Sequence, residues 1–139
     1  MGNLKKILVK KKKSYKSVWF MRQAGRYLPE FREIRSQNKN FIKLCLTSKL
    51  SSKITLQPIK RFNLDSAIIF SDILMVPYAL GQDVKFVKDQ GPELSGFNIE
   101  KFFDNNEKEF SQKLNPVYKA IEITRKSLDR DKSLIAFIG

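Results

Sequence analysis

The chain has 139 residues, with 27 Lys and Arg against 14 Asp and Glu, which gives a formal net charge of +13. Hydrophobic residues make up 42% of it, which excludes wholesale disorder, and no apolar run approaches the roughly 18 residues of a membrane-spanning helix. Because the sequence contains no histidine, the usual metal ligand and the commonest general base are excluded. Chemistry must therefore depend on carboxylates, guanidinium groups and lysines.

The N-terminal segment carries about half of the excess positive charge, since residues 1–16 hold seven lysines and no acidic residue. We expect residues 1–17 to form a flexible basic tail, because blocks of like charge are usually solvated. A small nucleic-acid-binding module is the alternative function, although no nucleic-acid motif accompanies the charge. No signal or transit peptide is recognisable, and the single cysteine, Cys45, is expected to be a buried thiol in a reducing compartment. The cytoplasm is the expected location.

The segment after the tail predicts a strand, two helices and a second strand. Residues 18–21 are apolar and rich in β-forming side chains, so they suit a buried strand. Pro29 fits the first position of a helix, and Ser48 can cap a second helix that Pro58 should kink or interrupt. Residues 67–70 are again short, apolar and continuous, as in a strand buried on both faces.

The rest of the chain predicts a small extra strand, a turn, a helix and a last strand. Residues 84–87 suit the extra strand and residues 90–92 the turn. Asn115 followed by Pro116 predicts the helix start, with Asn as its cap, and residues 134–138 form a third apolar strand. Strands alternating with helices indicate a parallel α/β sheet. With three strands and two crossover helices, we expect that sheet to be incomplete.

Four arginines fall within fourteen residues, beginning where the first predicted strand ends: Arg22, Arg26, Arg32 and Arg35. Guanidinium groups bind carboxylate or phosphate through two parallel hydrogen bonds, so this cluster suits a ligand with several acidic groups. Gly25 relaxes the backbone within the cluster, so that amide N–H groups are also able to point at an anion. The alternative is a surface helix start whose arginines pair locally with Glu30 and Glu33.

Asp72 is the second candidate, because it directly follows the strand predicted at residues 67–70 and Ser71. In parallel α/β folds, ligands bind and catalysis takes place at the C-terminal ends of the strands. An acid that caps a turn is the alternative interpretation.

The string Val-Trp-Phe-Met-Arg-Gln-Ala-Gly-Arg-Tyr-Leu-Pro-Glu-Phe-Arg-Glu at residues 18–33 closely resembles the N-terminal signature of uroporphyrinogen decarboxylase. Residues 56–81, with Leu-Gln-Pro and then Asp-Ser-Ala-Ile-Ile-Phe-Ser-Asp-Ile-Leu, resemble the second block of the same family. Residues 134–139 are similar to the start of the third block. One departure is Ser17, where family members usually have Pro.

The resemblance implies an α/β fold, namely the N-terminal part, about three strands, of a (β/α)8 TIM barrel that is incomplete in residues 18–139. It implies removal of carbon dioxide from the four acetate side chains of uroporphyrinogen III to give coproporphyrinogen III, without metal or organic cofactor, in porphyrin and heme biosynthesis. Uroporphyrinogen is then the expected partner, and the full-length family is expected to form a homodimer. As an N-terminal fragment, the chain is expected to be inactive alone, because the family's later strands and its downstream Tyr, Ser and His are absent.

Carried over by position, the implied substrate contacts are Arg22, Gln23, Ala24, Gly25, Arg26, Arg35 and Asp72. Asp72 is also the implied catalytic residue, because a carboxylate beneath the macrocycle would stabilise a cationic pyrrole. The proton donor stays open. A further alternative keeps the fold and changes the reaction, since related barrels transfer methyl groups to or from corrinoids with zinc ligands in their C-terminal half. The signature around Arg22 and Arg26 favours the decarboxylase.

Overall fold

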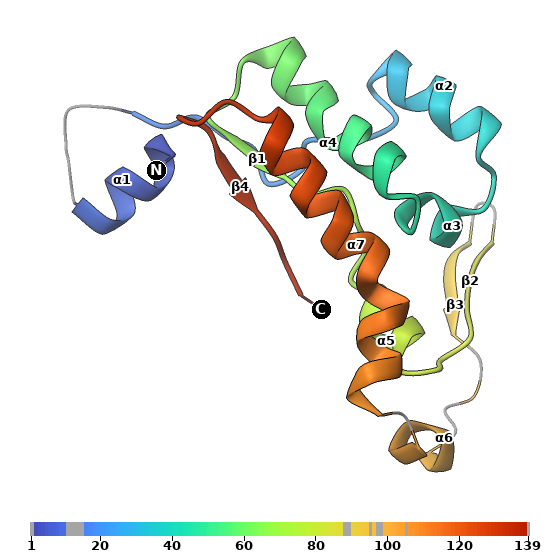
Figure 1. The fold of residues 1–139 in the computed structure, drawn as a ribbon. Helices are drawn as coiled ribbons and strands as arrows, with labels where there is room; N and C mark the ends of the chain where they lie inside the picture. Colours follow the sequence, from blue (N-terminus) through green and yellow to red (C-terminus); the bar gives the residue numbers. More distant parts are fainter. Residues whose placement is uncertain are drawn as a thin grey trace.

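The computed structural model describes residues 2–10, 16–87, 90–94, 96, 99–104 and 106–138. Its elements in chain order are α1 (Asn3–Lys10), α2 (Pro29–Gln37), α3 (Phe41–Cys45), α4 (Ser48–Phe62), β1 (Ser66–Ile68), α5 (Met75–Ala79), β2 (Val84–Val87), β3 (Gly91–Leu94), α6 (Ile99–Asp104), α7 (Glu107–Ser127) and β4 (Ser133–Ile135). Figure 1 shows the long helices α4 and α7 side by side, with α1 beside β4 and away from them.

A two-stranded parallel sheet joins two segments far apart in the chain, with Ala67 of β1 opposite Leu134 of β4. Both side chains belong to the cluster that the sheet forms with α4 and α7, together with Ile59 and Leu128. The right-handed twist of parallel strands favours a helical crossover between them, and α7 directly precedes β4. The prediction of parallel α/β structure is confirmed, and the described residues form no closed barrel.

Small and hydroxyl-bearing side chains let α4 and α7 approach closely. Thr124 of α7 is fully buried, and its hydroxyl donates to the Ser52 hydroxyl of α4 at 2.9 Å. Ala120, one turn earlier, is also fully buried. Near the other end of the contact, the Ser48 hydroxyl donates to the Pro116 carbonyl at 2.7 Å. These contacts hold the crossover helix on α4 and thereby place β4 beside β1.

The predicted helix start at Asn115 and Pro116 is wrong, because α7 begins nine residues earlier, at Glu107. Its cap is Asn106, whose side chain accepts a hydrogen bond from the Glu109 N–H at 2.9 Å. An Asn with a Glu three residues later is a strong start signal. Pro116 lies inside the helix, where packing against α4 and the bond from Ser48 outweigh its missing N–H.

Helix α4 differs from its prediction at the cap, and Pro58 does not interrupt it. It is one continuous helix through Pro58, which is fully buried, so packing again outweighs the lost hydrogen bond. Thr47 takes the cap position without a side-chain cap bond, and the hydroxyl of Ser48 is used on α7 instead. The helix ends at Phe62, and its C-cap Asn63 has a left-handed φ of 49° and accepts from the Lys132 ammonium at 2.8 Å.

The strand predictions at residues 67–70 and 134–138 are correct in place, although β1 and β4 are shorter. The strand predicted at residues 18–21 is wrong: this segment has no strand structure, and Met21 is 77% exposed. The extra strand at 84–87 is confirmed as β2, which pairs antiparallel with β3. Residues 91–92, predicted as a turn, lie in β3, where a positive φ of 96° suits Gly91. Proline at the next position is tolerated because a two-stranded ribbon consists of edges.

Residues 1–17, predicted as a flexible tail, include α1, and the Asn3 N–H donates to the Asp131 carbonyl at 2.6 Å. Residues 11–15 lie outside the described residues, and the flexibility of the tail stays a prediction. Within the described ranges, no helix combines the length and the apolar character needed to cross a membrane.

Candidate functional site

The carboxamide of Gln23 anchors the first part of the site to the free edge of β1. Its Nε2 donates to the Ser66 carbonyl at 2.7 Å, and its Oε1 accepts from the Ile68 N–H at 2.9 Å. The side chain is 4% exposed. Since this edge is occupied by a side chain, the backbone of residues 18–21 forms no ladder with β1. In this segment Val18 is tied to Asp65: its N–H donates to the Asp65 carboxylate, and its carbonyl accepts from the Asp65 N–H.

The loop that follows Gln23 is held at several points. The Tyr27 hydroxyl donates to the Gln23 carbonyl, and burial together with the nearby charge of Glu30 raises the pKa of this hydroxyl. The Leu28 N–H donates to the Gly25 carbonyl at 3.0 Å, and Leu28 itself is 1% exposed in the core. The loop between Gln23 and Leu28 is therefore fixed at both ends.

The side chains of Arg22 and Arg26 on this loop are exposed, and among the described residues neither forms an ion pair or a side-chain hydrogen bond. The predicted alternative of local pairing is wrong for Glu30, whose carboxylate accepts from Nε and Nη2 of Arg61 of α4 at 3.0 and 2.9 Å. Arg32 donates instead to the Arg26 carbonyl at 2.7 Å. Two guanidinium groups thus remain available to an external anion.

Asp72 stands shortly after β1, where two hydroxyls of α4 fix the backbone of Phe70. Thr55 accepts from the Phe70 N–H at 2.8 Å, and Ser51 donates to the Phe70 carbonyl at 2.5 Å. One oxygen of Asp72, Oδ1, accepts from the Leu74 N–H at 2.9 Å, so the predicted turn-capping role is present. The other oxygen has no described partner, and the half-buried carboxylate can still accept a hydrogen bond from a ligand.

Arg35 lies at the end of α2, and its guanidinium donates to the carbonyls of Asn38 and Lys39, the latter at 2.6 Å. Burial raises the pKa of the nearby Cys45 thiol to about 12; the charge of Asp72 adds to this effect and that of Arg35 opposes it. The Phe41 ring, 5.7 Å from the Arg35 guanidinium, packs against the core cluster that contains Cys45. Cys45 is fully buried, as predicted.

The loop of Arg22 and Arg26 is linked to the Asp72 segment through the core. Ala24 and Phe70 both pack against the cluster of Leu28, Phe31, Ile34, Leu44 and Ile54. Sequence reasoning missed the roles of Ser51, Thr55 and Tyr27, which hold these segments in place. The hydroxyls of Ser51 and Thr55 carry no local signal, since their partner Phe70 lies 19 and 15 positions away, whereas the partner of Tyr27 is only 4 positions away.

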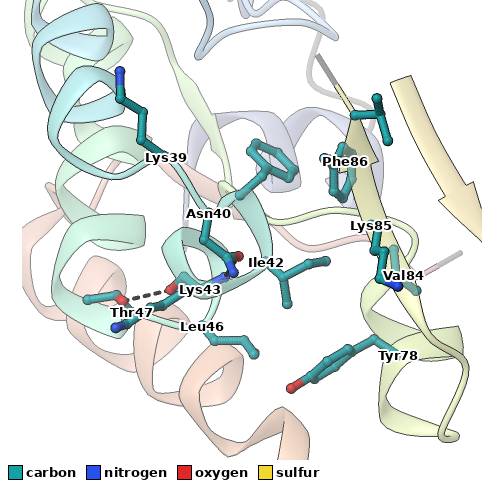
Figure 2. Close-up of a pocket in the computed structure, with 12 residues that line it drawn as sticks. Lys39, Asn40, Ile42, Lys43, Leu46, Thr47, Tyr78, Val84, Lys85 and Phe86 are labelled. Carbon is teal, nitrogen blue, oxygen red and sulfur yellow. Dashed lines mark hydrogen bonds between the residues drawn. The ribbon is translucent and has the colours of Figure 1, made fainter. Parts of the chain in front are cut away.

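A groove of about 760 Å³ lies beside this region, between α3, α5 and β2. Figure 2 shows Ile42 and Leu46 on one side, facing Tyr78 and Phe86 on the other. Phe41 connects the groove to the candidate site, because its ring lies 4.6 Å from that of Phe86 and 5.7 Å from the Arg35 guanidinium. None of the predicted site residues lines the groove.

The fold and these side chains define an α/β protein whose candidate site combines exposed arginines with one carboxylate. In the described part of the chain, no three Cys, Asp or Glu side chains gather as a metal-binding group.

Residues 2–139 match the model of the uroporphyrinogen decarboxylase (URO-D) family. The chain is also 43% identical over 122 residues to the uroporphyrinogen decarboxylases of Brucella ovis, Brucella canis and Brucella suis. Each match covers 88% of this chain and 36% of the relative, so the chain spans about a third of the relatives' length. The chain belongs to the uroporphyrinogen decarboxylase family, as the resemblance at residues 18–33 predicts.

Proposed function

We propose that this chain supplies the substrate-holding part of a uroporphyrinogen decarboxylase, which converts uroporphyrinogen III to coproporphyrinogen III by removing carbon dioxide from four acetate side chains. The observation that carries the proposal is the anchored loop that presents Arg22 and Arg26 without an ion-pair partner among the described residues. A substrate with eight carboxylates is attracted and oriented by such guanidinium groups. Family membership supplies the identity of that substrate.

In this proposal, Arg22 and Arg26 bind acidic side chains of the macrocycle, with the backbone of Ala24 and Gly25 beside it. Arg35 reaches a further carboxylate with the donors that Asn38 and Lys39 leave free, since a guanidinium has five N–H groups. Holding the substrate at several points orients the reacting acetate, which removes much of the entropic cost of reaching the transition state.

Asp72 is the proposed catalytic residue. When a ring carbon of the pyrrole is protonated, the ring becomes a cation that accepts the electron pair of the breaking carbon–carboxylate bond. The free carboxylate oxygen of Asp72 would accept hydrogen bonds from pyrrole N–H groups and stabilise that positive charge. Removing one such preorganised group typically costs about 3–4 kcal/mol of barrier.

The finer features of the whole protein are proposals as well: a (β/α)8 barrel, for which about 250 residues are typical, a homodimer, and a cytoplasmic location without metal or organic cofactor. Decarboxylases at 43% identity favour this reaction over methyl transfer to or from corrinoids. The nucleic-acid alternative has only the lysine-rich start in its favour, and we expect that association to be weak and to fall with salt.

The test uses a chimaera in which residues 18–139 replace the matching segment of a Brucella decarboxylase. We expect it to form coproporphyrinogen, with kcat about 100- to 1000-fold lower in Asp72→Asn. The double variant Arg22→Gln/Arg26→Gln should mainly raise KM. Arg61→Gln is the matched control, because this exposed arginine pairs with Glu30 and has no role in the proposed site. A folded chimaera that keeps full activity in Asp72→Asn would contradict the catalytic assignment.

The 139-residue chain alone should yield no coproporphyrinogen from uroporphyrinogen, because it spans 36% of the relatives' length. Sustained turnover by the purified chain would show that this part is sufficient for catalysis.

A further inference from the structure

We propose that Gln23 is a positioning residue. Its side chain stays on β1 and fixes the loop that carries Arg22 and Arg26, and this side chain does not bind the substrate. This role differs from the substrate contact that the resemblance implies for Gln23. The inference rests on the proposed function, because it concerns the same two arginines.

The first argument is the geometry of the edge of β1. In a parallel sheet, one residue of a neighbouring strand donates to a carbonyl and accepts from the N–H two positions further along. The carboxamide of Gln23 makes these two bonds, to the Ser66 carbonyl and the Ile68 N–H, on either side of Ala67. Ala67 is paired on the opposite edge with Leu134 of β4. Gln23 therefore acts as a one-residue strand on the edge that β4 leaves free.

The second argument is that this carboxamide has little left to offer a ligand. Both its nitrogen and its oxygen are engaged, and the side chain is 4% exposed. Turning it toward a substrate would leave the Ile68 N–H and the Ser66 carbonyl without their bonds on this edge. The neighbouring Arg22 and Arg26 have the opposite character, because both are exposed and unpaired among the described residues.

The third argument is the closure of the loop around Gln23. The backbone carbonyl of Gln23 accepts from the Tyr27 hydroxyl. The Gly25 carbonyl accepts from the Leu28 N–H, and the Arg26 carbonyl accepts from the Arg32 guanidinium. The main chain between Arg22 and Leu28 is thereby tied to β1, to α2 and to the core. Receptors that are rigid before binding lose less entropy when the ligand arrives. Loss of the Gln23 anchor should therefore weaken binding through the arginines.

The first experiment is a double-mutant cycle with the full chain and uroporphyrin, the fluorescent oxidised form of the substrate, whose quenching reports Kd. Gln23→Met keeps the length of the side chain and removes both hydrogen bonds. We expect it to weaken binding about tenfold, but less than twofold in the Arg22→Gln/Arg26→Gln background, because residues that act through one another are not additive. Gln57→Met is the matched control, since Gln57 is also buried but bonds to nothing described. It should leave Kd unchanged.

An equal loss in both backgrounds would overturn the positioning role and restore a direct contact. Full affinity in Gln23→Met would overturn it too. If the unsubstituted chain does not bind uroporphyrin, or binds it independently of the two arginines, the proposed function fails along with this inference. Binding that depends on the arginines while the cycle is additive overturns the inference alone.

A second measurement needs no substitution and so does not depend on how a variant folds. The Ile68 N–H on the free edge of β1 is covered by the Gln23 oxygen, so its hydrogen exchange should be slow in the free chain. Saturation with uroporphyrin should leave that exchange slow if Gln23 stays on β1. Faster exchange of this one amide on binding would show that the side chain turns to the ligand, and the positioning role would be wrong.

Discussion

Thr55→Val should destabilise the protein by removing one hydroxyl from the joint between α4 and the segment that leads to Asp72. Thr55 is fully buried; its hydroxyl donates to the Ser51 carbonyl at 2.8 Å and accepts from the Phe70 N–H at 2.8 Å. Valine has nearly the same shape, so the substitution leaves no cavity and changes only these two hydrogen bonds.

The two bonds are not equally costly to lose. The Ser51 carbonyl lies within α4 and keeps its place in the helical ladder, whereas the Phe70 N–H loses its described acceptor in a half-buried position. An unsatisfied buried donor costs about 1–3 kcal/mol, and replacing a buried hydroxyl by a methyl group recovers part of this. We expect a loss of about 1–2 kcal/mol of unfolding free energy.

Urea denaturation of the full chain measures this loss. With a slope of about 1–3 kcal/mol/M, the midpoint should fall by about 0.3–2 M. Thr47→Val is the control, because the Thr47 hydroxyl donates to the Lys43 carbonyl within its own turn and to no other described group. The change should stay below about 0.5 kcal/mol. Wild-type stability in Thr55→Val would refute the claim that this hydroxyl holds the Phe70 backbone.

Three further outcomes are expected. Gln57→Met should raise the unfolding free energy by about 1 kcal/mol in urea, because the buried carboxamide bonds to nothing described; an equal or lower value would contradict this. Because burial raises the pKa of Cys45 to about 12, an aromatic disulfide reagent at pH 8 should react only as the chain unfolds, and rapid labelling of the folded chain would count against it. Hydrogen bonds from Lys119 and Lys126 lower the pKa of Glu122 from 4.5 to about 2. The folded pKa lies below the unfolded one, so this stabilisation is present above pH 4.5 and disappears toward pH 2, and Glu122→Gln should flatten the acid limb of stability against pH.

Part of the candidate site follows from local sequence alone. Pro29 starts α2 as predicted, which places Arg35 in the last turn of that helix. The apolar run at 67–70 predicts a buried strand, and Asp72 follows it in the structure. The likeness of residues 18–33 to one family is confirmed by the family match. These features depend on neighbours within a few positions, where backbone geometry and side-chain type act directly.

Other features depended on partners far along the chain. Glu30 does not pair with the arginines near it in sequence, because it forms its ion pair with Arg61, which lies 31 positions away. From local sequence, Pro116 predicts a helix start. In the structure α7 continues through it, because α4 packs against α7 and Ser48 bonds to the Pro116 carbonyl. No local pattern shows which hydroxyls of α4 meet Phe70. Tertiary packing supplies these partners, and its free energy exceeds the local preferences that it overrides.

The arginine-rich loop combines both kinds of information. Sequence by itself determined its composition, its place after an apolar segment and its family. Only the tertiary structure decided that residues 18–21 form no strand, because the carboxamide of Gln23 takes the donor and the acceptor on the edge of β1. The Gln23 side chain and a strand backbone compete for the same two hydrogen bonds on β1. The side chain makes them, with partners 43 and 45 positions away in the sequence.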